Sequence, residues 1–173
     1  AHYTTIAQSV DIPIMLYNVP GRTGTKMTAE TIAALSEIPN IVAVKEACGS
    51  VDQVTEILER CTITVLSGDD GLTLPMMAVG ATGVVSVAAN IVPKDVAALC
   101  RLANEGKYDE ARKLHYKLAR LFKTLFIETN PMPVKAALSR MGVIKNNVRL
   151  PLVPLAGKNL DTLDALLKEM NLI

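Results

Sequence analysis

One run of residues, Ile41-Val42-Ala43-Val44-Lys45, is followed directly by Glu46-Ala47 and guides the interpretation of the whole chain. Four consecutive apolar residues predict a strand that is buried on both faces. A lysine on such a strand is costly unless its charge is paired or removed. A lysine held neutral by its surroundings can attack a carbonyl carbon, so Lys45 is a candidate nucleophile. The alternative is a lysine at the end of a strand whose ammonium group simply reaches water.

Strands and helices alternate around this run. We expect strands at about 12–17, 41–45, 62–67 and 83–88, separated by helices that begin near residues 29, 51, 72 and 93. Four consecutive strand–helix units require a parallel sheet. Beyond residue 106 the strand patterns stop, and helices are expected at about 107–127, 134–141 and 160–170. The sequence therefore predicts an α/β part over residues 1–106 and an all-helical part over residues 107–173.

Composition excludes several classes of protein. The 173 residues carry a formal net charge of +1, which gives no support to a nucleic-acid or membrane-surface partner. No apolar run approaches the ~18 residues of a membrane-spanning helix. Three widely spaced cysteines, an odd number, suggest reduced thiols in a cytoplasmic protein and not a disulfide framework or metal site: Cys48, Cys61 and Cys100.

Reactive groups in parallel α/β folds gather at the carboxyl ends of the strands. Polar residues stand at several of these ends here, namely Tyr17-Asn18, Lys45-Glu46 and Ser67-Gly68-Asp69-Asp70. Alternation along the strand places Ile41 and Ala43 on the side of Lys45, with Val42 and Val44 toward the helices. We therefore expect Tyr17 and Lys45, on adjacent strands, to approach each other at one mouth of a barrel.

Several segments together resemble the dihydrodipicolinate synthase (4-hydroxy-tetrahydrodipicolinate synthase) family. They are Tyr-Asn-Val-Pro-Gly-Arg-Thr-Gly at 17–24, Val-Lys-Glu-Ala at 44–47, Ser-Gly-Asp-Asp at 67–70, Gly-Val-Val-Ser-Val-Ala-Ala-Asn at 83–90 and Asn-Pro-Met-Pro-Val-Lys at 130–135. Their order and spacing match across essentially the whole chain. The resemblance implies a TIM (β/α)8 barrel and a class I, Schiff-base enzyme of lysine and diaminopimelate biosynthesis.

The same resemblance implies roles for five residues. Lys45 matches the lysine that condenses with pyruvate, and Tyr17 matches the tyrosine that relays protons during imine formation and cyclisation. Arg22 matches the arginine that holds the carboxylate of the second substrate, aspartate semialdehyde. Gly68 and Val85 match positions that line the substrate pocket. The family needs no metal or organic cofactor, because the lysine imine is itself the electron sink.

The resemblance begins in the helix before the fifth barrel strand of the family. It therefore implies that residues 1–106 are strands 5–8 of the barrel with their helices, and residues 107–173 the C-terminal helical appendage. A barrel of this type needs ~250 residues, so we expect a truncated chain that is inactive or weak alone. Its open apolar face is expected to drive association with a second copy, as a homo-oligomer, or with a complementary N-terminal half.

The sequence is also compatible with other functions. N-acetylneuraminate lyases and keto-deoxy sugar-acid aldolases use the same lysine and tyrosine, although the loop at 21–24 favours the synthase. A non-catalytic half-barrel that serves in assembly is a second alternative, and a phosphate-binding barrel is a third that the acidic pair at 69–70 disfavours.

The single residues have structural alternatives too. These are an ordinary strand aromatic for Tyr17, a solvated charge for Arg22, loop caps for Asp69-Asp70, a packing residue for Cys48 and a structural role for His115.

Overall fold

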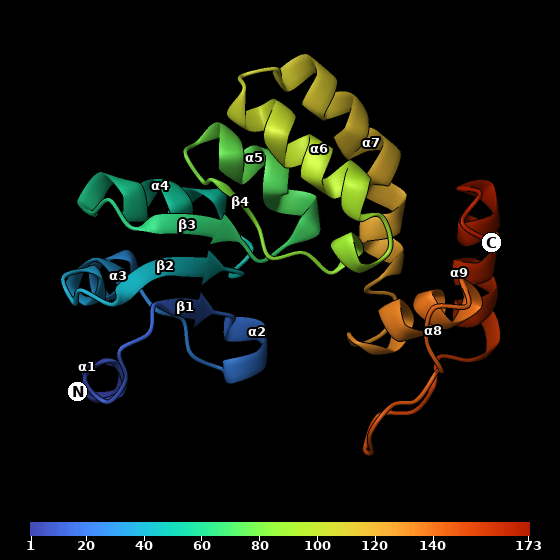
Figure 1. Ribbon diagram of the computed structural model, residues 1–173, viewed down its shortest axis with the longest axis horizontal. Coiled ribbons are helices and arrows are strands. Elements are labelled where there is room, and N and C mark those ends of the chain that lie inside the picture. Colours follow the sequence, from blue (N-terminus) through green and yellow to red (C-terminus); the bar gives the residue numbers. More distant parts are fainter. The chain divides into compact units, whose positions relative to one another are not determined.

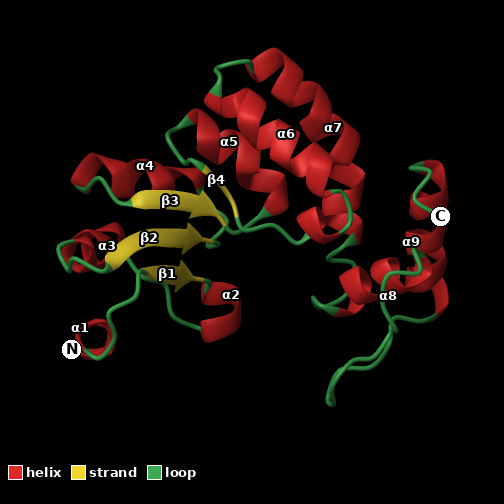
Figure 2. Cartoon of the chain, in the orientation of Figure 1, coloured by secondary structure: helices red, strands yellow, loops and turns green.

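The computed structural model describes residues 1–173, and the chain divides into two compact units. The first unit comprises residues 1–85 and 103–106. Its centre is a parallel sheet of β1 (Ile14–Asn18), β2 (Ile41–Glu46), β3 (Thr64–Ser67) and β4 (Gly83–Val84), which lie side by side in that order (Figures 1 and 2). The predicted α/β class with a parallel sheet is confirmed.

Helices of this unit follow the strands in the expected order: α1 (His2–Gln8), α2 (Pro20–Thr23), α3 (Ala29–Ser36), α4 (Val51–Arg60), the 3-10 turn η1 (Asp70–Leu72) and α5 (Thr73–Ala78). Thr28 and Ser50 are side-chain N-caps of α3 and α4, which begin where the sequence predicted. Helix α3 packs against α4 and β2, and α5 packs against β3. The core between sheet and helices gathers side chains at most 1% exposed: Leu16, Ala29, Ile32, Val44, Val54, Ile57, Val65 and Met76.

The start of β2 departs from the sequence prediction. The pairing of β1 with β2 slips by one residue, so Ile41 lies opposite Ile14 while Ala43 lies opposite Met15. Ile41 is 3% exposed, whereas Val42 at the slip is 44% exposed. An irregularity of this kind interrupts the alternation of side chains along a strand. The expected burial therefore holds for Ile41, Ala43 and Val44 but not for Val42.

Two further predictions need correction. The loop expected at 21–24 lies largely within α2, because Pro20 is pre-set for the first helical turn and Gly24 ends it with a left-handed φ of 71°. The strand expected at 83–88 is only two residues long. The backbone N–H of Val85 still donates to Ser67 O at 2.8 Å, and a 3-10 turn, η2 (Ala88–Asn90), follows.

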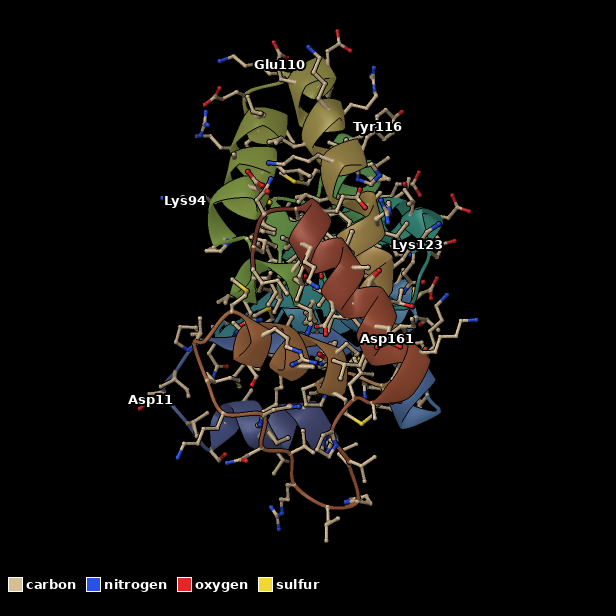
Figure 3. The ribbon with its side chains drawn as sticks, turned by 90° about the vertical axis from the view of Figure 1, so that its right-hand side faces the viewer. Asp11, Lys94, Glu110, Tyr116, Lys123 and Asp161 are labelled. Carbon is tan, nitrogen blue, oxygen red and sulfur yellow. The ribbon has the colours of Figure 1, made fainter.

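The second unit comprises residues 86–102 and 107–173 and contains no strand. Its helices are α6 (Pro93–Asn104, whose last two residues belong to the first unit), α7 (Tyr108–Thr124), α8 (Met132–Arg140) and α9 (Gly157–Glu169). Both α7 and α8 pack against α9. The helix predicted at about 107–127 is confirmed as α7, and four of its side chains are buried: Ala111, Leu118, Leu121 and Phe122. Tyr116 lies on the opposite, outer side of α7 and is 68% exposed (Figure 3).

Ion pairs join helices of the second unit. Lys117 of α7 lies 2.7 Å from Asp95 of α6, and Arg140 of α8 lies 2.9 Å from Asp164 of α9. In each pair the cation is exposed and the carboxylate is partly exposed, so water screens the pair and its contribution to stability is small. No disulfide joins the three cysteines, and none of the helices is both long enough and apolar enough to cross a membrane.

Candidate functional site

Tyr17 and Lys45 meet at the carboxyl ends of two adjacent strands. They are direct partners in the register of β1 and β2, so their side chains leave the sheet on the same face. The Nζ atom of Lys45 lies 4.0 Å from the centroid of the Tyr17 ring. This is the geometry of a cation–π contact, in which an ammonium group sits over an aromatic face. The predicted approach of these two side chains is confirmed.

The Tyr17–Lys45 pair is more exposed to water than the sequence predicted. Lys45 is half-buried, and Tyr17 is 43% exposed. Met15, two residues before Tyr17 and on the same face, is 44% exposed. Helices of the first unit cover the other face of the sheet, where Leu16 and Val44 are at most 1% exposed. The amine therefore lies at the edge of a face that water reaches.

Gly68, directly after β3, lies under the Lys45 side chain. A Cβ atom on Gly68 would lie 3.1 Å from both Cγ and Cε of Lys45, so the aliphatic stem of the lysine passes over this glycine. The same Cβ would lie 2.6 Å from Cβ of Ala47, closer than real carbon atoms approach. The backbone N–H of Gly68 donates to Glu46 O at 2.7 Å. A residue without a side chain at position 68 thus leaves the space that Ala47 and the stem of Lys45 occupy.

The remaining two predicted site residues lie at the same edge of the sheet. Arg22 stands on α2, directly after β1, and its side chain is exposed. Val85 directly follows β4 and is half-buried. All five candidates thus come from segments at or just beyond the carboxyl ends of the strands. Lys45 lies close to both Tyr17 and Gly68. Arg22 and Val85 lie at the same edge of the sheet as these three residues.

Asn18 and Glu46 form a buried pair whose role the sequence did not reveal. Glu46 is fully buried and Asn18 is 1% exposed. Their side chains are hydrogen-bonded to each other, with Asn18 Nδ2 at 2.9 Å from Glu46 Oε2. The alternation of side chains along each strand could have indicated this pair, because it places both residues on the helix-covered face. A carboxylate buried there needs a hydrogen-bond partner.

Cys48 lies beside this pair. Burial raises the pKa of its thiol to about 11, and the hydrogen bond and negative charge of Glu46 add to the increase. A thiol with a raised pKa is a poor nucleophile because the thiolate is scarce at neutral pH. The structure therefore agrees with a packing role for Cys48.

Two other residues singled out by the sequence have structural surroundings. Asp69 Oδ1 accepts a hydrogen bond from the backbone N–H of Gly71 at 2.9 Å, which is the expected loop cap. His115 on α7 lies against the rings of Tyr116 and Phe122, and burial lowers the pKa of its imidazole.

Comparison with known proteins agrees with this geometry. The sequence profile described as the Dihydrodipicolinate synthetase family matches residues 1–170. The chain is 51% identical over 176 residues to the 4-hydroxy-tetrahydrodipicolinate synthase of Persephonella marina, covering 99% of this chain and 60% of the relative. It is 53% identical over 174 residues to the enzyme of the same name from Citrifermentans bemidjiense, with the same coverage. The chain thus spans about 60% of the length of these curated relatives.

Solved structures give the same result. The crystal structure of dihydrodipicolinate synthase from Aquifex aeolicus superimposes with a TM-score of 0.97 at 49% identity, covering 99% of this chain and 59% of that one. A chloride-inhibited dihydrodipicolinate synthase from Acinetobacter baumannii, complexed with pyruvate, superimposes with a TM-score of 0.96 at 42% identity, covering 99% of this chain and 60% of that one. With a profile match over nearly its whole length, the chain belongs to the dihydrodipicolinate synthetase family.

Proposed function

We propose that this chain supplies the imine-forming residues of a 4-hydroxy-tetrahydrodipicolinate synthase, which condenses pyruvate with L-aspartate 4-semialdehyde in lysine and diaminopimelate biosynthesis. The observation that carries this proposal is the position of Lys45 Nζ, 4.0 Å from the centre of the Tyr17 ring at the carboxyl edge of a parallel sheet. The names of the relatives and the pyruvate complex of the Acinetobacter baumannii enzyme support the choice of substrates.

In the proposed reaction, the neutral amine of Lys45 attacks the keto carbon of pyruvate. The resulting carbinolamine loses one water molecule to give an imine. Loss of a proton from the methyl carbon gives an enamine, whose carbon attacks the aldehyde of aspartate semialdehyde. The amino group of the second substrate, after losing a proton, attacks the imine carbon, closes the ring and releases Lys45 as a free amine. The atoms balance with the net release of one water molecule and one proton.

Tyr17 and Arg22 have distinct proposed roles. The steps at Lys45 need a group that passes protons to and from nitrogen and oxygen, and a phenol hydroxyl can do so. In the structure the amine lies over the ring face, so it must move toward the Tyr17 hydroxyl for direct transfer. Arg22 is exposed at the end of β1, where its guanidinium can hold the carboxylate of the second substrate with two parallel hydrogen bonds. Gly68 and Val85 line the pocket in this proposal.

We also propose that β1–β4 correspond to strands 5–8 of a (β/α)8 barrel, with residues 1–106 as the barrel part and 107–173 as a C-terminal helical domain. The parallel order β1-β2-β3-β4 supports this assignment. A sheet whose free face exposes Met15 and Tyr17 also supports association with a second copy of the chain or with a complementary set of strands.

The experiment that tests the function is reductive trapping. The chain is incubated with pyruvate and cyanoborohydride, digested, and every lysine is scored by mass spectrometry for the mass of pyruvic acid less one oxygen atom. We expect selective modification of Lys45 and its loss in Lys45→Arg, at a low rate because the amine is only half enclosed. Modification spread evenly over exposed lysines, with Lys45 no faster than Lys94, would refute the proposal.

The substrate class is tested on the same reaction. Aspartate semialdehyde should consume the Lys45 enamine and lower the yield of trapped pyruvate, because it competes with the reductant. N-acetylneuraminate or keto-deoxy sugar acids in place of pyruvate should leave Lys45 unmodified. The opposite pattern would favour a sugar-acid aldolase.

A further inference from the structure

The residues immediately after Tyr17 and Lys45 form a second pair on the other face of the sheet. Asn18 and Glu46 are direct partners in the register of β1 and β2, as Tyr17 and Lys45 are. Side chains alternate along a strand, so the pair Tyr17–Lys45 lies on one face of the sheet and the buried pair Asn18–Glu46 lies behind it on the other. Any change in the register of the two strands moves both pairs together.

Hydrogen bonds fix the orientation of the Asn18 side chain. Its Oδ1 atom accepts from the backbone N–H of Met27 at 3.0 Å, and its Nδ2 atom donates to Met27 O at 3.2 Å. Turning the amide over would place a donor against a donor and an acceptor against an acceptor. Nδ2 must therefore face Glu46, where it lies 3.1 Å from Oε1 and 2.9 Å from Oε2.

Both carboxylate oxygens of Glu46 accept hydrogen bonds. Besides Asn18 Nδ2, the backbone N–H of Cys48 donates to Oε1 at 2.8 Å. A side chain whose two terminal atoms both act as acceptors suits a carboxylate and not an amide. Burying such a group is costly unless all its acceptors are satisfied, so this contact is specific to the chemistry of the pair.

The network extends to the segment that carries Arg22. Met27 closes the stretch between β1 and α3, and its backbone N–H and carbonyl are both bound by Asn18. Gln53 Nε2 on α4 donates to the same carbonyl at 3.0 Å and is 2% exposed. The segment 19–27 is thus tied at its far end to the strand that bears Tyr17.

We propose that Asn18 and Glu46 are positioning residues for the site. Their hydrogen bond locks the register in which Lys45 lies over the Tyr17 ring, and the bonds of Asn18 to Met27 hold the Arg22 segment at the same edge. That these side chains react with pyruvate rests on the proposed function. That Asn18 and Glu46 hold them together rests on the structure alone.

An exchange of the two functional groups tests this proposal. Asn18→Asp places two carboxylates against each other, and Glu46→Gln places an amide donor against Asn18 Nδ2. In the double variant N18D/E46Q, the amide introduced at position 46 donates to the carboxylate introduced at position 18. That carboxylate still accepts from Met27 N–H, and the new amide oxygen still accepts from Cys48 N–H. The donation to Met27 O is lost, and an oxygen faces that carbonyl in both Asn18→Asp and the double variant. Gln53 still donates to the carbonyl, so the double variant should recover the contact between positions 18 and 46 that each single variant loses.

A matched control lies at the opposite end of the strands. Asn40 precedes β2, and its Nδ2 donates to the carbonyls of Ala7 at 2.9 Å, Val10 at 3.0 Å and Ile12 at 3.4 Å. Asn40→Asp is the same isosteric change and loses a comparable set of hydrogen bonds. It should lower the melting temperature without disturbing Tyr17 and Lys45.

Two readouts separate positioning from general stability. Ring current from Tyr17 shifts the Lys45 ε-methylene protons upfield in NMR spectra, and trapping by pyruvate and cyanoborohydride reports the reactivity of Lys45. We expect both single variants to lose the ring-current shift and to lower the maximal trapping rate about tenfold or more, since small misplacement at a reacting centre is costly. The double variant should restore most of both, and Asn40→Asp should change neither by more than about twofold when compared below its melting temperature.

The outcomes are decisive in both directions. Single variants that keep the ring-current shift, or a double variant no better than the worse single one, would overturn the positioning role. If the single variants do not fold, recovery of folding and of the shift in the double variant supports the proposal, and its absence overturns it. A ring-current shift that follows the predicted pattern, in a wild-type chain that never traps pyruvate at Lys45, would refute the proposed function and leave the positioning role supported.

Discussion

Gly68→Ala should displace Lys45 from its place over Tyr17. The added Cβ would lie 2.6 Å from Cβ of Ala47 and 3.1 Å from Cγ and Cε of Lys45. Carbon atoms in ordinary contact are ~3.5–4.0 Å apart, so the first distance is short by roughly 1 Å. The lysine stem can rotate away, but the Ala47 Cβ is fixed to the backbone, so the loop after β2 must also move.

The size of the effect follows from these contacts. Inserting a methyl group into a filled site costs about 1–3 kcal/mol of folding stability. Displacement of a reacting group by about 1 Å can lower a rate about 100-fold. We therefore expect Gly68→Ala to lose about 1–3 kcal/mol in urea denaturation and to trap pyruvate at Lys45 tens of times more slowly than the wild-type chain.

Gly21→Ala provides the matched control. Gly21 lies in α2, its backbone is not in the left-handed region, and an added Cβ would have no atom within 4 Å. This variant should be neutral or more stable by up to about 1 kcal/mol, because alanine loses less backbone entropy on folding. Wild-type stability and an unchanged Lys45 ring-current shift in Gly68→Ala would show that the close packing around Gly68 does not hold Lys45 in place.

Three other predictions concern single groups. Cys48, with its pKa raised to about 11, should react with iodoacetamide more slowly at pH 8 than an unfolded thiol, and Glu46→Gln should speed the reaction by lowering that pKa, although burial, the larger cause, persists. Because burial lowers the folded-state pKa of His115, the unfolded chain binds more protons as pH falls below about 6.5; stability should decline through that range, and His115→Gln should flatten the decline in urea titrations at successive pH values. Ser50→Ala should cost about 1 kcal/mol in the same assay by removing the cap of α4, and an unchanged midpoint would contradict the capping role.

Much of the fold follows directly from the sequence. The alternation of apolar runs with helical stripes predicts the parallel sheet, and the residues Thr28 and Ser50 predict where α3 and α4 begin. The placement of Tyr17 beside Lys45 follows from two facts only: parallel strands share their carboxyl edge, and alternate residues share a face.

Other features depend on long-range contacts that a local pattern does not contain. The pairing of β1 with β2 shifts near Val42, which is exposed, and nothing in the run of apolar residues signals either feature. Gln53 has the spacing of a capping box with Ser50, yet its side chain binds Met27 O instead. The pairing of Asn18 with Glu46 joins residues 28 positions apart, and only the register of the strands brings them together.

Site-resolved trapping in Tyr17→Phe tests the chemistry most directly. Phenylalanine keeps the ring under the Lys45 amine and removes only the hydroxyl, so the ring-current shift should persist while the trapping rate at Lys45 falls about 100-fold or more, the usual contribution of a positioned proton donor. Wild-type modification should be concentrated at Lys45. Equal trapping rates in the two chains, or equal modification of Lys45 and exposed lysines in the wild type, would contradict a shared role for this amine and this phenol.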